Sequence, residues 1–134
     1  MDMQEQHDRG LALRRKLFGD AAVESHMNAF GTFGEPLQHI INAYAYGDVW
    51  SRPALPLGTA SLVMVGMMAA AGRAKELRVH LKGAIENGCK PEEVQQVLLL
   101  VALYCGIPAA NEAHQAAFEV LKAGESPASN GVQG

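Results

Sequence analysis

The sequence predicts an all-α fold, and three of its features support that prediction. Apolar residues recur at spacings of three and four, as they do on the buried face of a helix. Glycines and prolines divide the chain into segments of helical length. No stretch of useful length alternates apolar and polar residues in the manner of a strand. We therefore expect a bundle of about six helices.

The first 47 residues predict three helices. Leucines at helical spacing indicate a helix over residues 3–18, which Gly19 interrupts. Asp20 is placed to cap a second helix that ends near residue 30. Gly31 and Gly34 form a flexible joint before a third helix, which has a proline in its first turn and extends to Gly47.

The centre of the chain predicts a loop and two helices. Two prolines make a persistent helix improbable over residues 48–56, so we expect a structured loop there. Thr59 can cap an intensely apolar helix that ends at Gly72. A more charged helix follows over residues 73–87, with almost no loop between the two.

Two further helices follow. Pro91 and the two glutamates behind it make a favourable first turn for a helix that is almost entirely apolar from Val97 to Cys105. Such a helix is expected to be surrounded by others or by a partner subunit. Gly106 ends it, and Pro108 begins a last helix to about residue 122.

Length and composition favour one compact domain over residues 1–123. The chain has 134 residues, of which 49% are hydrophobic and 19% charged. Residues 124–134 are mostly small and polar, which predicts a disordered tail.

Charge and cysteine content exclude several classes of partner. A formal charge of -3 gives no general attraction to nucleic acid or anionic lipid, and the basic run Arg14 to Lys16 is interpreted as a solvated helix face. The longest apolar run, residues 62–71, is too short to cross a bilayer. Two well-separated cysteines and no recognisable leader sequence favour a cytoplasmic protein with reduced thiols.

The helix over residues 73–87 carries the first candidate site. At 100° per residue, Arg73, Glu76 and His80 lie along one margin of its apolar stripe. A carboxylate four residues from an imidazole can raise the imidazole pKa and orient the ring, and that ring can then donate or accept a proton. The alternative is an ordinary solvated helix flank with a satisfied histidine.

The segment around Trp50 is the second candidate. Tyr46 and Trp50 supply large amphipathic surfaces beside Arg52, a combination suited to a small planar anion because a guanidinium binds a carboxylate at two points. The alternative is an aromatic anchor that packs a loop.

No metal or nucleotide cofactor is predicted. The histidines at 7, 26, 39 and 114 show no metal-ligand spacing with one another, and the chain has no HExxH, CxxC or P-loop motif. Cys105, beside Tyr104 at the end of the apolar helix, is interpreted as a small hydrophobic residue.

Four stretches resemble the γ-carboxymuconolactone decarboxylases. The arginine-rich opening that closes on Gly19-Asp20 matches their start, and Tyr44 to Pro53 looks like their aromatic-Gly-acid-hydrophobe-Trp-Ser/Thr-Arg-Pro signature. The block from Tyr104 to Asn111 is also similar, as is the hairpin that carries His80. The resemblance covers about residues 7–122.

The resemblance implies an alkylhydroperoxidase-D-like helical bundle with a central antiparallel hairpin, assembled as a homo-oligomer, a trimer or a hexamer. It also implies cofactor-free decarboxylation of 4-carboxymuconolactone to 3-oxoadipate enol-lactone in the protocatechuate branch of aromatic catabolism. His80 would then be the proton shuttle and Glu76 its orienting partner. Arg52 would hold the retained carboxylate, while Trp50 and Tyr104 would wall the pocket.

One related activity is excluded, and one departure from the decarboxylases keeps alternatives open. Arg73 and Glu76 stand where the related peroxidases have their paired cysteines, so peroxide reduction by that route is excluded. Gly58 and Ala60 stand where the decarboxylases usually have basic residues, and Arg73 could replace one of those charges. The alternatives are therefore a paralogue that acts on another small lactone or acid, or a non-catalytic oligomeric helical binding protein.

Overall fold

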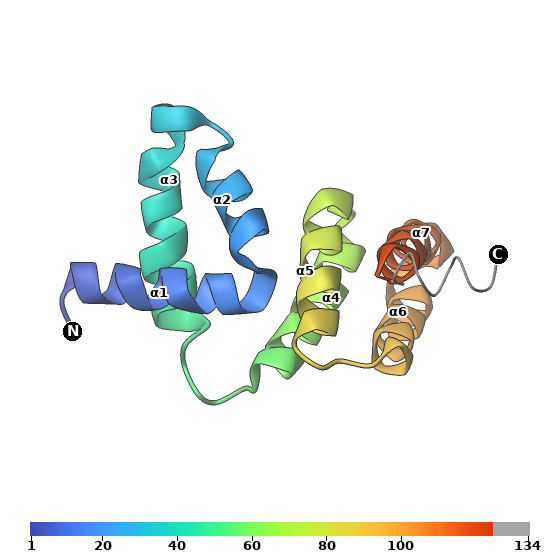
Figure 1. Ribbon diagram of the computed structural model, residues 1–134. Helices are drawn as coiled ribbons and strands as arrows, with labels where there is room; N and C mark the ends of the chain where they lie inside the picture. The colour runs from blue at the N-terminus through green and yellow to red at the C-terminus, as the bar shows by residue number, and fades with distance from the viewer. Residues whose placement is uncertain (125–134) are drawn as a thin grey trace, which may run out of the picture. The chain divides into compact units, whose positions relative to one another are not determined.

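The computed structural model describes residues 1–124, and the described part is all-α, as predicted (Figure 1). The predicted disordered tail lies outside the described residues apart from Gly124. Among residues 1–124, no helix has the length and apolar character needed to span a bilayer. The chain divides into two compact units, Met1–Ala60 and the part from Ser61 onward. That residues 1–123 form a single domain stays a prediction.

The first unit is built on a crossing of two helical rods. Helix α1 (Met3–Phe18) is followed by α2 (Asp20–Asn28) and by a 3-10 turn, Gly31–Gly34. Helix α3 (Glu35–Ile40) continues without a break into a π-helix, Ile41–Val49. Figure 1 shows α1 lying across this second rod. The helix therefore extends two residues beyond Gly47, where the sequence predicted its end.

Glycines make the crossing possible. A Cβ atom added to Gly10 would lie 1.6 Å from the carbonyl oxygen of Asn42, and one added to Gly47 would lie 2.2 Å from the carbonyl oxygen of Gln6. Neither distance is physically possible, so the two backbones approach closely only because both residues lack a side chain.

Side chains of α1 stabilise the wide turns of the π-helix. The amide of Gln6 donates to the carbonyl of Ala43 at 2.8 Å, and Nε of Arg9 donates to the carbonyl of Gly47 at 3.0 Å. The hydroxyl of Ser51 also donates to the Gly47 carbonyl, at 2.7 Å. These bonds fix the rod that leads to Trp50.

The second unit has one apolar core. Helices α4 (Leu57–Ala71) and α5 (Ala74–Glu86) are separated only by Gly72 and Arg73, and α6 (Pro91–Cys105) and α7 (Ile107–Ala123) follow (Figure 1). All four contribute to the core, which includes Val65, Leu77, Leu81, Leu98 and Ala116. Between α6 and α7, Gly106 takes a positive φ of 99°, which turns the chain sharply.

Three local predictions were wrong. Asp20 does not cap α2, because Gly19 holds the N-cap position and Asp20 is the first residue of the helix. Thr59 does not cap α4, because the helix begins two residues earlier, at Leu57. Arg14 is not on a solvated face: it is 5% exposed and packs in the core of the first unit with Leu17. Its position follows from the spacing Gly10, Arg14, Leu17, which is one helical stripe.

The glycine crossing predicts a large cost for a single methyl group. We expect Gly10→Ala to lower the free energy of unfolding by about 3 kcal/mol or more, because backbone atoms of the π-helix cannot move aside. Urea unfolding at a fixed protein concentration measures the change.

Gly66→Ala is the matched control for that substitution. Its new Cβ would meet only Val97 Cγ1, at 3.4 Å. The control should therefore change the unfolding free energy by less than about 1 kcal/mol, in the stabilising direction that helix propensity favours. Equal effects of the two substitutions would contradict the close crossing.

Candidate functional site

His80 lies in the buried stripe of α5. The residue is 8% exposed and is flanked by the fully buried Leu77, Leu81 and Ala84. Glu76, one turn earlier on the same helix, is exposed. His80 itself is thus not solvated, and both a satisfied, packed histidine and a catalytic one fit this burial.

Burial dominates the charge state of His80. The pKa of His80 is lowered from its ordinary value because burial disfavours the imidazolium, while the negative charge of Glu76 acts in the opposite direction. The Glu76 carboxylate raises the pKa of His80, as expected, but this effect is smaller than the lowering caused by burial. The imidazole is consequently neutral at pH 7 in the absence of a bound anion.

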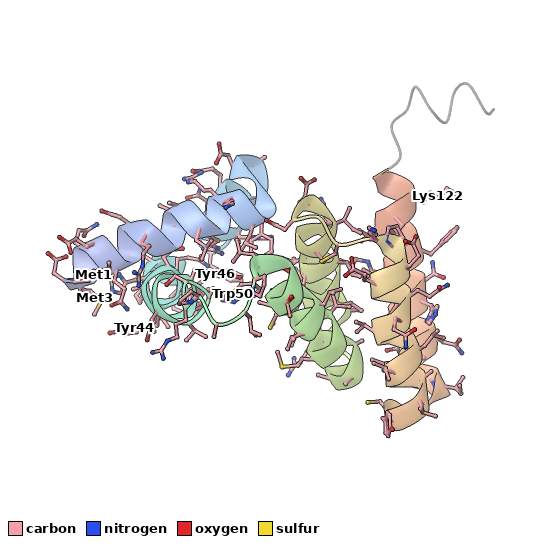
Figure 2. The ribbon with its side chains drawn as sticks, turned by 90° about the horizontal axis from the view of Figure 1, so that it is seen from below. Met1, Met3, Tyr44, Tyr46, Trp50 and Lys122 are labelled. Atoms are coloured by element: carbon pink, nitrogen blue, oxygen red, sulfur yellow. The ribbon has the colours of Figure 1, made fainter. Side chains whose placement is uncertain are left out.

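Tyr46 and Trp50 form a stacked pair at the end of the π-helix. Their ring centroids are 5.5 Å apart and their planes differ by 25°. Figure 2 shows the two side chains next to each other. Phe18 meets Tyr46 edge-on, at 5.9 Å between centroids. Burial raises the pKa of Tyr46 to about 12, against the opposing effect of Arg14, so the phenol stays neutral.

Arg52 is held by a carboxylate of its own chain. Its Nε and one terminal nitrogen donate to the same oxygen of Asp48, at 3.1 and 2.9 Å. The Arg52 side chain is nevertheless 69% exposed. A bound carboxylate would therefore compete with Asp48 for a guanidinium that solvent already reaches.

Arg73 and Tyr104 occupy the ends of helices. Arg73 is the exposed residue just before α5. Tyr104, near the end of α6, is 80% exposed and so does not wall a pocket within its own unit. It could wall a pocket only where another surface covers it.

The predicted site residues therefore fall into two groups. Tyr46, Trp50 and Arg52 lie in the first unit, and Arg73, Glu76, His80 and Tyr104 lie in the second. In the first group, Tyr46 lies in the π-helix, and Trp50 and Arg52 follow that helix in the sequence. In the second group, Arg73 precedes α5, Glu76 and His80 lie within it, and Tyr104 lies on α6. The convergence of Trp50, Arg52, Glu76 and His80 on one cavity stays a prediction.

Sequence reasoning missed a polar cluster around Arg14. One terminal nitrogen of Arg14 donates to Oε1 of Gln38 at 2.7 Å and to Oδ1 of Asn42 at 3.1 Å. Its guanidinium carbon lies 5.9 Å from the centre of the Tyr46 ring. Burial lowers the pKa of Arg14, with a small opposing effect of Tyr46. The helical spacing of Gly10, Arg14 and Leu17 was the signal that could have identified it.

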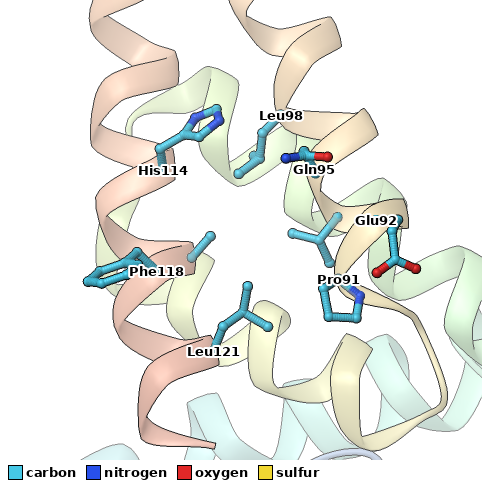
Figure 3. Close-up of a pocket in the computed structure, with 9 residues that line it drawn as sticks. Pro91, Glu92, Gln95, Leu98, His114, Phe118 and Leu121 are labelled. Carbon is cyan, nitrogen blue, oxygen red and sulfur yellow. The ribbon is translucent and has the colours of Figure 1, made fainter.

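A groove of about 320 Å³ lies between α6 and α7 (Figure 3). Pro91, Gln95 and Leu98 line it from α6, and His114 and Phe118 line it from α7. Nδ1 of His114 donates to the carbonyl of Ala110 at 2.7 Å. None of the predicted site residues lines this groove. Within residues 1–124, no three His, Cys, Asp or Glu side chains gather closely enough to hold a metal ion.

Comparisons with known proteins identify the family. The model of the carboxymuconolactone decarboxylase family matches residues 35–119, a range that includes every predicted site residue. A 4-carboxymuconolactone decarboxylase from Acinetobacter baylyi is 37% identical over 122 residues, which are 91% of each chain. The nitrosuccinic acid decarboxylase of Metarhizium robertsii is 35% identical over 106 residues, 79% of this chain and 74% of the relative. The chain belongs to the carboxymuconolactone decarboxylase family.

Proposed function

We propose that the protein is a carboxy-lyase that converts 4-carboxymuconolactone to 3-oxoadipate enol-lactone and carbon dioxide, in the cytoplasmic catabolism of aromatic compounds. One observation carries the proposal: the 37% identity to a decarboxylase of that name extends over 91% of both chains. The reaction as proposed requires no metal or organic cofactor.

The substrate itself supplies the electron sink. The bond between the ring carbon and the departing carboxylate breaks, and its electron pair enters the conjugated system that ends at the lactone carbonyl. The resulting carbanion then takes one proton and becomes the enol-lactone. The enzyme must bind two carboxylates, exclude water from the one that leaves and deliver a proton.

His80 is proposed to deliver the proton, with Glu76 as its positioning partner. The proposal is supported by the burial of His80 in α5 and by the effect of Glu76, which raises a pKa that burial lowers. A dianionic substrate beside the ring would raise that pKa further, so substrate binding would itself charge the proton donor.

The remaining groups are proposed to bind the substrate. Arg52 would hold the retained carboxylate, exchanging its two hydrogen bonds to one oxygen of Asp48 for bonds to both oxygens of the ligand. Arg73 would supply a second cation. The stacked Tyr46 and Trp50 would form an apolar wall, and Tyr104 another.

A homo-oligomer, a trimer or a hexamer, is proposed because one end of the second unit exposes many large apolar side chains. Leu103, Tyr104 and Ile107 at the turn from α6 to α7 are 73%, 80% and 63% exposed. Leu99 and Leu100, one turn before them, are each about half exposed. A patch of this kind is typical of a protein interface, and covering it would bury Tyr104.

A second candidate function is decarboxylation of another small acid. Gly58 and Ala60 occupy positions where the 4-carboxymuconolactone decarboxylases usually carry basic residues. The relative named for nitrosuccinic acid suggests which kind of acid to test, one whose nitro group can accept the electron pair. The non-catalytic alternative, an oligomeric binding protein, predicts turnover of neither acid.

Turnover decides among these functions. The purified protein should release carbon dioxide from 4-carboxymuconolactone generated in situ, and His80→Ala should lower kcat by about a hundredfold or more, as expected for loss of a general acid. His114→Ala, which removes an exposed histidine from the same unit, is the control and should retain activity. Turnover of nitrosuccinate alone would favour the second candidate, and turnover of neither acid by folded protein would reject a lyase for these substrates.

The charge balance at His80 predicts two separated pH profiles. If the imidazolium donates the proton, kcat/KM falls as pH rises through the lowered pKa of the free enzyme, below 6.5. The same limb of the kcat profile should lie at higher pH, because bound carboxylates raise the pKa of His80. Glu76→Gln removes a charge that raises this pKa and should move both limbs to lower pH. Unmoved limbs in this variant would contradict the role of Glu76.

The exposed apolar end predicts that assembly is sensitive to one charge. Leu103→Glu should lower the molar mass measured by sedimentation, because a carboxylate at the centre of an apolar interface is costly to bury. Lys82→Glu places the same side chain at an exposed position of α5 and should leave the mass unchanged. A wild-type protein that sediments as a monomer would contradict the proposed oligomer.

A further inference from the structure

Arg14 is a buried cation that donates hydrogen bonds to neutral side-chain amides. The residue is 5% exposed, and its two hydrogen bonds go to the side-chain amides of Gln38 and Asn42. Within residues 1–124 it forms no ion pair with a carboxylate. Burying a charge without a counterion is unfavourable, and an apolar side chain of similar length would fill the same space at lower cost. The guanidinium therefore has a role that apolar packing does not provide.

The amides of Gln38 and Asn42 determine where the guanidinium lies. Both residues belong to the rod that crosses α1, and both are buried, Asn42 completely. Their oxygens hold one terminal nitrogen of Arg14 at 2.7 and 3.1 Å. Because the guanidinium is planar and rigid, fixing one nitrogen also restricts the rest of the group.

The guanidinium in turn supports an aromatic stack. Its central carbon is 5.9 Å from the centre of the Tyr46 ring, within the range of a cation–π contact. The Tyr46 ring also stacks on the ring of Trp50, with 5.5 Å between the two centroids. A continuous series of contacts thus leads from α1 through Tyr46 to Trp50.

We propose that Arg14 is a positioning residue that holds the Tyr46–Trp50 stack in the orientation in which it forms a wall of the substrate site. The inference rests on the proposed function, which assigns Tyr46 and Trp50 to that wall. Arg14 itself is too deeply buried to touch a substrate, so its effect passes through the two rings.

The spectroscopic signals of Trp50 report on the Tyr46–Trp50 stack, because Trp50 is the single tryptophan of the sequence. Arg14→Met removes the charge and the planar group while keeping most of the side-chain length. In the folded variant we expect loss of the near-ultraviolet circular dichroism of Trp50 and greater quenching of its fluorescence by acrylamide. Arg14→Lys keeps the charge without the planar fork and should recover only part of both signals.

The kinetic counterpart is a rise in KM. A displaced wall should weaken binding of 4-carboxymuconolactone, raising KM by about tenfold while kcat changes less. Arg15→Met is the matched control: it removes the neighbouring arginine, which pairs at the surface with Asp20 and Glu24, and should leave both Trp50 and KM unchanged.

Unchanged Trp50 signals in folded Arg14→Met would overturn the proposal, and so would altered signals with an unchanged KM. If Arg14→Met does not fold, Gln38→Met removes the 2.7 Å bond to Arg14 and should shift the Trp50 signals in the same direction. If the wild-type protein turns over no substrate, the proposed function fails. The spectroscopic comparison then still decides whether Arg14 orients the stack.

Discussion

The close crossing of α1 over the π-helix is the constraint on which the first unit depends. Gly10 and Gly47 allow two backbones to approach within a distance that no side chain tolerates. That approach brings the side chains of Gln6 and Arg9 to carbonyls of the π-helix, where they satisfy the wide turns. It also buries Arg14 against the same rod. Without the crossing, Tyr46 and Trp50 would have neither their fixed backbone nor their support.

Local chemistry explains why much of the fold was predictable from the sequence. Gly19 and Pro91 mark helix boundaries so clearly that the predicted end of α1 and the predicted start of α6 agree with the structure. The π-helix was not predictable, because its wide turns depend on donors from α1, a segment more than thirty residues earlier in the sequence. The spacing of apolar residues along the sequence does not predict hydrogen bonds between such distant segments.

For the candidate site as well, the features set by local spacing could be predicted and those set by packing between distant segments could not. Helical spacing placed Arg73, Glu76 and His80 on one margin of α5, but it could not show that burial outweighs the Glu76 charge at His80. That balance depends on packing against other helices. For Arg14 the spacing with Gly10 and Leu17 was present, yet its neighbours Arg15 and Lys16 suggested a solvated face. Three adjacent basic residues on a helix point in three directions, so their charge alone does not predict exposure.

Burial shifts the pKa of one or more side chains in each unit. Arg14, Tyr46 and His80 each have a pKa displaced by desolvation, and in each case a neighbouring group opposes the displacement only partly. Groups whose pKa is shifted by burial are found more often at functional sites than elsewhere. Tyr46 and His80 lie within residues 35–119, which the family model matches. Arg14 lies outside that range, on the helix that crosses the π-helix carrying Tyr46.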